Sequence, residues 1–220
     1  FNKPGTYLAY TVDAADTDGN GLYLADLRTG TRRALDNAKQ RYARLTWSPE
    51  GDAVAALRGE TPEKKTERAN VLVAVRSLDA PVAGRVIFDP ASAPGLGEGW
   101  VISEKGSLSW SEDLATVFVG TRAQEDKLED WPKDALPLAD VNIWHWADDR
   151  IQTAQQRQAP QDRERTWLAA VHLAESRLVP LADDRMRTVD LTRDGRWGMG
   201  RDATKYVSDW KPDQADYYRV

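Results

Sequence analysis

The sequence predicts an all-β fold of repeated antiparallel hairpins, and three observations carry this prediction. Apolar residues stand two positions apart, as they do on one face of a strand. A phrase made of strand, polar corner and strand occurs at Leu45–Leu57, and it returns from Leu108 and from Val189. A second hairpin phrase stands upstream of these corners, so the chain repeats a unit larger than one hairpin.

The corner of the recurring phrase has the residues of a tight turn. Ser48–Gly51, with the sequence SPEG, places a hydroxyl first, proline second and glycine fourth, which predicts a type I turn. Thr192–Gly195 keeps this frame without the proline. In the middle copy Leu114 replaces the glycine, so that turn is the weakest of the three predictions.

The upstream phrase is a second hairpin. It occurs at Leu22–Leu35 and again at Trp167–Leu181, and Val71–Phe88 is a looser third copy. Two hairpins in succession make a unit of four antiparallel strands, and repetition of such a unit is typical of a β-propeller. We therefore predict that residues 1–220 form a partial β-propeller of four-stranded antiparallel blades, with about three blades plus partial blades.

The repeats are longer than those of common propellers, which indicates insertions. Gly59–Asn70 is charged and poor in apolar residues, so we expect an exposed loop there, and Asp89–Trp100 is rich in residues that break helices and strands. The longest insertion runs from about Gln124 to Arg165. The part that begins DVNIWHW predicts a strand, and Asp148–Ala159 predicts a helix that an aspartate caps and Pro160 ends.

Composition excludes several classes of site. The chain has no cysteine, which excludes disulfides, thiolate metal sites and a cysteine nucleophile, and two histidines are too few for most histidine-based metal sites. We therefore expect no metal and no cofactor. The net charge of -5 argues against a nucleic-acid partner. No apolar run approaches the roughly 20 residues that cross a bilayer, so we expect no membrane partner.

The repeat resembles the propellers of TolB-type proteins and the N-terminal propeller of the prolyl oligopeptidase family of serine peptidases. The stretches VNIWHWADDRIQTAQQRQA, TWLAAVHLAESRLVPLADD and DLTRDGRW are similar to the propeller of bacterial peptidases of that family. There the propeller covers a separate α/β-hydrolase domain and admits peptides rather than folded proteins. The resemblance thus implies two partners, an α/β-hydrolase domain of the same polypeptide and a peptide substrate. Because many relatives are exported, it also implies a periplasmic or secreted location.

The sequence predicts no catalytic residues in this chain. A hydrolase of that family needs a nucleophile elbow, G-x-S-x-G, and no serine here is so flanked, so the hydrolase domain is absent from residues 1–220. The dipeptidyl peptidase branch holds the substrate amino terminus with paired glutamates after an Asp-Trp. Here Asp130-Trp131 is followed by Pro132–Asp134, so we do not transfer that role.

The candidate substrate-binding residues are Trp144, His145, Trp146 and Arg150. Strand alternation would place the two tryptophans on one face and His145 on the other. We favour packing of both rings between blades, and the alternative is contact with a peptide or a sugar. Arg150 is a candidate for contact with a peptide carboxylate or with the hydrolase domain.

Other polar residues favour structural roles. We expect His172 to be structural, because it occupies the strand position that Asp26 has in the aligned copy. The pairs Asp148-Asp149 and Asp183-Asp184 lie where strands end, which favours turn and capping roles. The run Asp162–Arg165 is typical of a solvated charged face.

The favoured function is that of a non-catalytic, substrate-gating propeller domain of a prolyl oligopeptidase-type serine peptidase. The alternative is a TolB-type propeller that binds a protein and has no peptidase activity, and a third candidate is a carbohydrate-binding propeller. The chain begins with Phe1 rather than Met and ends on DYYRV, which is typical of a strand, so we expect a fragment. A fragment exposes apolar blade surface, which a homodimer would cover.

Overall fold

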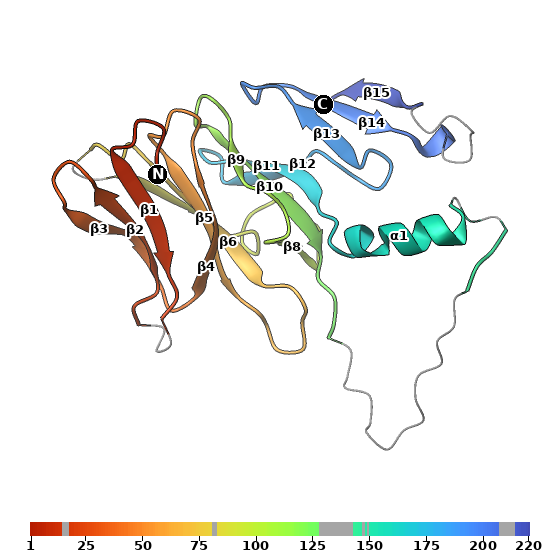
Figure 1. Ribbon diagram of the computed structural model, residues 1–220, viewed down its shortest axis with the longest axis horizontal. Helices are drawn as coiled ribbons and strands as arrows, with labels where there is room; N and C mark the ends of the chain where they lie inside the picture. Colours follow the sequence, from red (N-terminus) through yellow and green to blue (C-terminus); the bar gives the residue numbers. More distant parts are fainter. Residues whose placement is uncertain (15–17, 81–82, 128–142, 147, 149, 207–213) are drawn as a thin grey trace, which may run out of the picture.

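The computed structural model describes residues 1–14, 18–80, 83–127, 143–146, 148, 150–206 and 214–220. Four antiparallel sheets stand side by side in chain order (Figure 1). We call them blades one to four. This arrangement confirms the predicted fold class, a partial β-propeller with one long insertion.

The strands of the first two blades have the following bounds. Blade one holds β1 (Tyr7–Val12), β2 (Gly21–Asp26) and β3 (Arg32–Asn37). Blade two holds β4 (Arg41–Trp47), β5 (Val54–Glu60), β6 (Ala69–Arg76) and β7 (Gly84–Phe88). Each strand pairs with its successor within the blade, so both blades are simple meanders.

The remaining elements belong to the second half of the chain. Blade three holds β8 (Trp100–Ile102), β9 (Ser109–Trp110), β10 (Thr116–Ala123), β11 (Trp167–His172) and β12 (Arg177–Pro180). Blade four holds β13 (Thr188–Leu191), β14 (Gly198–Asp202) and β15 (Asp216–Arg219). The helical elements of the described chain are α1 (Gln152–Arg163) and the short 3-10 turn η1 (Thr204–Tyr206). The first strand of blade three is split into β8 and β9, which both pair with β10.

Every predicted hairpin is confirmed by antiparallel pairing. The corner phrases become β4–β5, β9–β10 and β13–β14, and the upstream phrases become β2–β3, β6–β7 and β11–β12.

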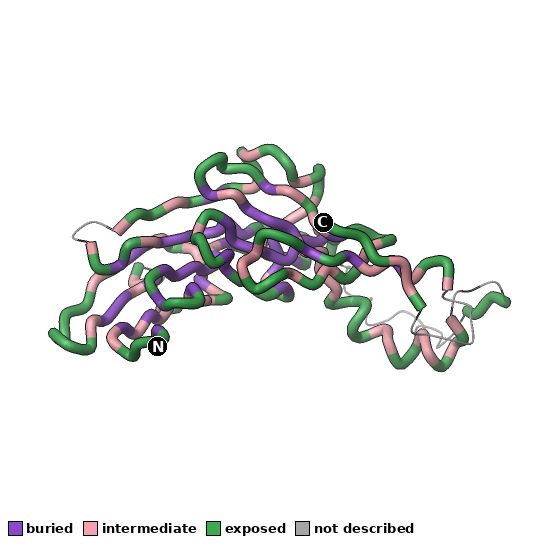
Figure 2. Tube along the Cα trace, turned by 90° about the horizontal axis from the view of Figure 1, so that it is seen from above, coloured by how far each residue is buried: buried purple, intermediate pink, exposed green. Residues whose placement is uncertain are grey.

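Two apolar interfaces hold blades one to three together. In β5, Val54 and Ala56 pack toward blade one, whereas Ala55 and Leu57 pack toward blade three. All four are fully buried, because successive residues of a strand point to opposite faces and both faces are covered. The buried segments therefore lie in the middle of the molecule, between sheets (Figure 2).

The predicted corners share one hydrogen-bond pattern. In blade two the Gly51 N–H donates to the Ser48 carbonyl at 3.0 Å, and the Ser48 N–H donates to the Ala53 carbonyl at 2.9 Å. The Ser48 hydroxyl accepts the Ala53 N–H at 3.0 Å, so one side chain closes the turn. Ser111 in blade three and Thr192 in blade four do the same with the N–H five residues on.

The fourth corner residue has a left-handed backbone in each copy. Its φ is 81° at Gly51, 58° at Leu114 and 70° at Gly195. Glycine takes this conformation without steric cost, and a leucine does so at about 1–2 kcal/mol. Leu114 packs against the apolar interface of blades two and three, and we infer that this contact offsets the cost.

A fourth copy of the corner, which the sequence analysis did not find, lies at Asn2–Gly5. The Gly5 N–H donates to the Asn2 carbonyl at 3.0 Å, and Gly5 has a φ of 72°. The Asn2 side-chain oxygen accepts the Tyr7 N–H at 2.8 Å, as the Ser48 hydroxyl does in blade two. An amide replaces the hydroxyl, which is why the sequence pattern missed it.

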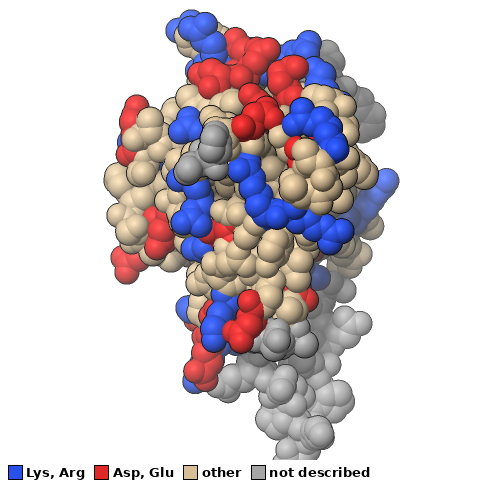
Figure 3. Space-filling model, turned by 90° about the vertical axis from the view of Figure 1, so that its left-hand side faces the viewer, with Lys and Arg blue, Asp and Glu red and all other residues tan. Residues whose placement is uncertain are grey.

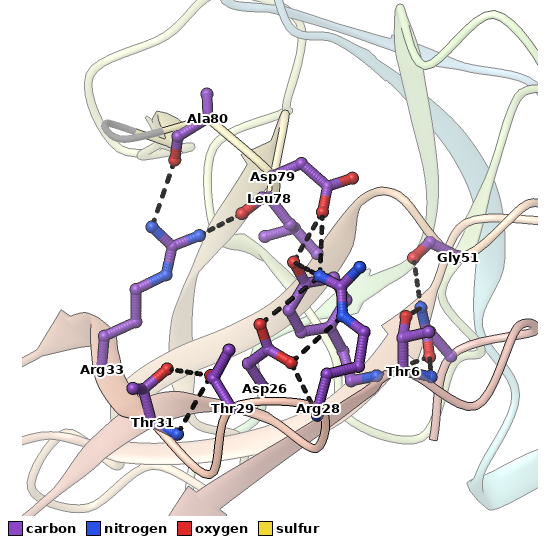
Figure 4. A network of polar contacts seen from close by, with 12 residues as sticks. Thr6, Asp26, Arg28, Thr29, Thr31, Arg33, Gly51, Leu78, Asp79 and Ala80 are labelled. Carbon is purple, nitrogen blue, oxygen red and sulfur yellow. Dashed lines mark hydrogen bonds and ion pairs between the residues drawn. The ribbon is translucent and has the colours of Figure 1, made fainter.

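Polar contacts join blade one to the turn after β6 in blade two (Figure 4). The Tyr7 hydroxyl donates to Asp79 at 2.6 Å, which raises the pKa of Tyr7 together with burial. Arg28 donates to the same hydroxyl at 3.2 Å, and Arg33 donates to the Ala80 carbonyl at 3.3 Å. These contacts fix the edge of the apolar interface between the two blades.

The long insertion differs from its prediction. The predicted helix over Asp148–Ala159 is wrong at both ends, because α1 begins at Gln152 and includes Pro160. Pro160 stands in the last turn, so the hydrogen bond that it removes and the crowding of its ring against the preceding turn affect only the end of the helix, and Gln, Ala and Arg favour the helix. The predicted strand is also wrong where it is described, since Ile143–Trp146 is not in a strand, and its remainder lies outside the described residues.

Blade four ends the array with an open face. Met199 is 49% exposed and Tyr217 is 57% exposed, and both lie on the same face of β14 and β15, where Met199 pairs with Arg219 and Tyr217 pairs with Arg201. That a second copy of the chain covers this face stays a prediction.

We predict that a methyl group is tolerated far less at two corner glycines than at a matched glycine. In Gly51→Ala the new Cβ would lie 2.7 Å from the Lys3 nitrogen, and in Gly195→Ala it would lie 2.9 Å from the Ser111 Cβ. Gly30 has a φ of 71° and nothing within 4 Å, so Gly30→Ala reports backbone strain alone.

Urea denaturation measures the three losses. We expect about 1 kcal/mol for Gly30→Ala and at least about 2 kcal/mol for each corner variant. Equal losses at all three positions would show that the corners do not pack on the neighbouring blades.

Candidate functional site

The long insertion builds the candidate site beside blade three. The chain leaves the blade after β10 and returns at β11, and α1 stands next to the end of the blade (Figure 1). Arg122, at the end of β10, donates to the Arg163 carbonyl at 2.7 Å. This bond joins the last turn of the helix to the blade, so the insertion has a fixed position on a rigid sheet.

A cleft of about 730 Å³ lies between the insertion, the end of β10 and the loop after β5. We call it the insertion cleft, and its lining includes Thr66, Glu67, Lys105, Arg122, Arg150 and Trp167. The loop after β5 was predicted to be exposed, and residues 61–64 are exposed. The prediction is wrong at Glu67, which is 7% exposed, because cations of blade three surround it.

Glu67 is a buried carboxylate that is paired with two cations and one hydroxyl donor. Lys105 lies 3.0 Å away and Arg122 3.4 Å away, and the Ser103 hydroxyl donates at 2.9 Å. Burial by itself raises the pKa of Glu67, but the bonds from Lys105 and Ser103 and the charge of Arg122 outweigh burial and hold it below its usual value. A carboxyl that stays ionised is a poor proton donor, so Glu67 holds the loop to blade three.

A second cleft, of about 520 Å³, lies between α1 and blade four. We call it the arginine cleft, because its lining includes Arg150, Arg165, Arg185, Arg187 and Arg201. The first two arginines come from the insertion, one just before α1 and one just after it, and the other three come from blade four and the segment before it. The cleft therefore exists only when the insertion and blade four are both in place.

The predicted aromatic residues are exposed. Trp144 is 55% exposed and Trp146 is 83% exposed, so the favoured prediction that both rings pack between blades is wrong. The reason is that this segment is not a strand and stands outside the sheets. His145 lies beside the Trp146 ring, with 5.5 Å between ring centroids.

Arg150 is the predicted site residue that reaches a cleft. It lines both clefts, and its guanidinium lies 3.3 Å from Asp162 in α1. In the described part of the chain, neither tryptophan lines either cleft. The structure thus places Arg150 in the interior of the site, and it places Trp144 and Trp146 on the surface of the insertion.

The paired aspartates have different roles. Asp148 accepts the His145 N–H at 3.0 Å and a Gln155 amide N–H at 3.1 Å, and these bonds lower its pKa. Asp183 accepts the Met186 N–H at 2.7 Å, which agrees with a turn role. Asp184 lines the arginine cleft instead. Asp149 and the stretch from Asp130 to Asp134 lie outside the described residues.

Two further predictions have clear outcomes. His172 lies opposite Thr116 on the neighbouring strand, and its Nδ1 is 3.2 Å from the Thr116 hydroxyl, which agrees with a structural role. Asp162–Arg165 was predicted to be a solvated face, and residues 162–164 are exposed, while Asp162 also forms ion pairs with both Arg150 and Arg165. The spacing of the sequence gave no sign of the distant partner, because the pairing depends on how the insertion folds back.

Among the described residues, no group of three or more His, Cys, Asp or Glu is placed to hold a metal ion. No helix among them is long and apolar enough to cross a membrane.

Comparisons with known proteins were made for the whole chain. No family model and no curated protein matches it. Among solved structures it is similar to TolB from Acinetobacter baumannii, at 12% identity and a TM-score of 0.40, over 98% of this chain and 38% of that chain. A prolyl endopeptidase structure is 14% identical with a TM-score of 0.43, over 97% of this chain and 28% of that chain. The chain therefore spans well under half the length of either protein.

A third similar structure is described as a β-propeller domain. The Cps50 (Swd1) β-propeller domain from Myceliophteria thermophila is 12% identical with a TM-score of 0.30, over 100% of this chain and 70% of that chain. The fold itself follows from the strand pairing described above.

We predict that Glu67→Gln destabilises the fold at neutral pH by about 2 kcal/mol, because it removes charge-assisted hydrogen bonds from a buried site. The pKa of Glu67 is depressed in the folded chain, so the stability it contributes is present above the unfolded value near 4.5. It is lost as pH falls through the folded value. Urea denaturation at pH 7 and in acid measures both effects.

Glu125→Gln is the matched control, because Glu125 also contacts Arg122 but is 65% exposed. We expect this change to cost less than about 1 kcal/mol at pH 7. A Glu67→Gln loss that persists unchanged in acid would mean that packing, rather than charge, explains it.

Proposed function

We propose that the chain is a non-catalytic propeller domain that controls the access of peptides to an α/β-hydrolase domain of the same polypeptide. The observation that carries this proposal is the insertion between β10 and β11. It stands at one end of a rigid blade, it presents exposed tryptophans, and it borders two clefts lined by charged groups. Binding groups on a loop that a scaffold positions are typical of recognition sites.

The resemblance of the insertion supports the same proposal. The stretch from Val141 to Ala159 is similar to the propeller of prolyl oligopeptidase-type peptidases, and this stretch includes all four candidate substrate-binding residues. In such an enzyme these four residues would contact the peptide where it enters. Trp144 and Trp146 offer large apolar surfaces with few rotamers, which suits transient contact with an extended peptide.

The chemistry of the described residues supports a role without bond making. The Thr116 hydroxyl beside His172 is buried within blade three, where a substrate carbonyl has no access. The sequence has no G-x-S-x-G nucleophile elbow. The proposal therefore gives the serine peptidase activity to the hydrolase domain and gives access to the propeller.

The complete reading frame decides between this proposal and its alternative. We expect it to encode a G-x-S-x-G elbow in a strand-to-helix context, together with an acid and a histidine that complete a triad. A frame without these elements would overturn the gating proposal and leave a TolB-type interaction propeller.

We predict that Trp144→Ala with Trp146→Ala in the complete enzyme changes the hydrolysis of long peptides more than that of a dipeptide-sized chromogenic substrate. The expected change in kcat/KM for long peptides is about tenfold, carried by KM, because a contact made equally in ground and transition states alters binding alone. Trp197→Ala is the control, since Trp197 is also half exposed but belongs to blade four. An equal loss for both substrate lengths, or a loss in kcat, would contradict the gating role.

A further inference from the structure

We propose that the arginine cleft is a binding site for a peptide carboxylate. This inference rests on the proposed function in one respect, that the ligand is a peptide. The site itself is defined by the contacts of the described residues, and the experiment below reads it without any hydrolysis.

The cleft has a surplus of positive charge. Five arginines line it, and Asp184 supplies the one carboxylate among its described lining residues. The surface of blade one is different, because acidic and basic side chains are interspersed there (Figure 3). A concave surface lined by one sign of charge raises the local concentration of ligands of opposite sign.

Nearby carboxylates neutralise some of the arginines but not all. Asp162 pairs with Arg150 and with Arg165. Asp202 lies 3.5 Å from Arg185, whose side chain is 75% exposed. The pKa of Asp162 is lowered, first by its bond from Arg165 and then by the charges of Arg150 and Arg187, as expected in a positive field.

Two arginines have no carboxylate partner among the described residues. Arg187 donates its Nε–H to the backbone carbonyl of Asp184 at 2.9 Å. The Nε of Arg201 is buried and has no hydrogen-bond partner. An unpaired buried donor costs about 1–3 kcal/mol, so an acceptor that enters the cleft would remove this cost.

One further polar group of the cleft favours a peptide over a simple anion as the ligand. The Gln158 side-chain oxygen, from the cleft-facing side of α1, is buried and also has no partner. The cleft thus offers an unpaired acceptor on Gln158 and an unpaired donor on Arg201. A peptide supplies both complements, a carboxylate for the arginines and a backbone N–H for Gln158, whereas phosphate at its usual charge supplies acceptors almost exclusively.

The residue types also favour carboxylate over phosphate. Guanidinium groups can bind carboxylates through two parallel hydrogen bonds, and Arg150 and Arg165 of the cleft already pair with the neighbouring Asp162 carboxylate. The described lining contains no glycine, so it lacks the backbone N–H loop that typically holds phosphate. A peptide carboxylate has two sources, an acidic side chain and the chain terminus.

The test uses the 220-residue chain and fluorescently labelled peptides, with binding followed by anisotropy. One peptide carries internal glutamates and an amidated C-terminus, a second is neutral with a free C-terminal carboxylate, and a third is neutral and amidated. We expect the first or the second to bind at least about tenfold more tightly than the third, with affinity that falls as salt rises. The tighter of the two identifies the source of the carboxylate.

Variants tie the affinity to the cleft. Arg187→Gln and Arg201→Gln should each lower the affinity for the preferred peptide about tenfold, as expected for loss of a charge-assisted bond. Arg177→Gln is the matched control, because Arg177 is a half-exposed arginine of β12 whose partner is Glu175, and it should bind as the parent does. Arg187 is exposed, so Arg187→Gln tests the site even if Arg201→Gln fails to fold in a melting experiment.

Three results would overturn the inference. They are equal affinity for all three peptides, an equal loss in the Arg177→Gln control, and displacement of every peptide by inorganic phosphate at a concentration below that of a matched carboxylate, which would indicate a phosphate site. None of these depends on a hydrolase domain. Conversely, a reading frame without a nucleophile elbow would end the gating proposal and leave the measured selectivity in place.

Discussion

Blade two is a thin antiparallel sheet with two apolar faces, and the rest of the structure depends on covering both of them. Val54 and Ala56 of β5 are fully buried against blade one, and Ala55 and Leu57 are fully buried against blade three. A strand with this pattern has no face for water, so each blade is stable only between neighbours. Where the described chain supplies no neighbour, Met199 of blade four stands half exposed.

The corners carry this stacking from one blade to the next. Asn2 in the corner of blade one donates to the Gly51 carbonyl of blade two at 3.2 Å, and the Glu112 N–H of blade three donates to the Asp194 carbonyl of blade four at 3.3 Å. Each corner thus satisfies its own backbone and also contacts its neighbour. At Gly51 and Gly195 the left-handed backbone brings the corner close to the neighbouring blade. A Cβ added at either glycine would therefore meet atoms of that blade.

The insertion packs weakly on itself, and contacts with the blades hold it where it borders the two clefts. Helix α1 has no buried residue, so burial of its own side chains cannot hold it in place. Charged contacts position it instead, through Arg122 to the Arg163 carbonyl and through Asp162 to the arginines just before and just after the helix. The same arginines that anchor the helix line the clefts. The proposed recognition therefore depends on the same charges that hold the helix, and blade four with the segment before it supplies the guanidiniums that have no carboxylate partner among the described residues.

The alternation of apolar residues and the turn residues act over a few positions, so the sequence alone was enough to predict the hairpins, their grouping into blades and the glycine corners. It misjudged the burial of Trp144 and Trp146, since local alternation cannot show whether a segment joins a sheet. It also missed the corner at Asn2. Which arginines meet in one cleft, and which of them lack a carboxylate partner, depends on the tertiary structure, because the packing of the insertion beside blade four, and not spacing in the chain, brings Arg150 and Arg201 together.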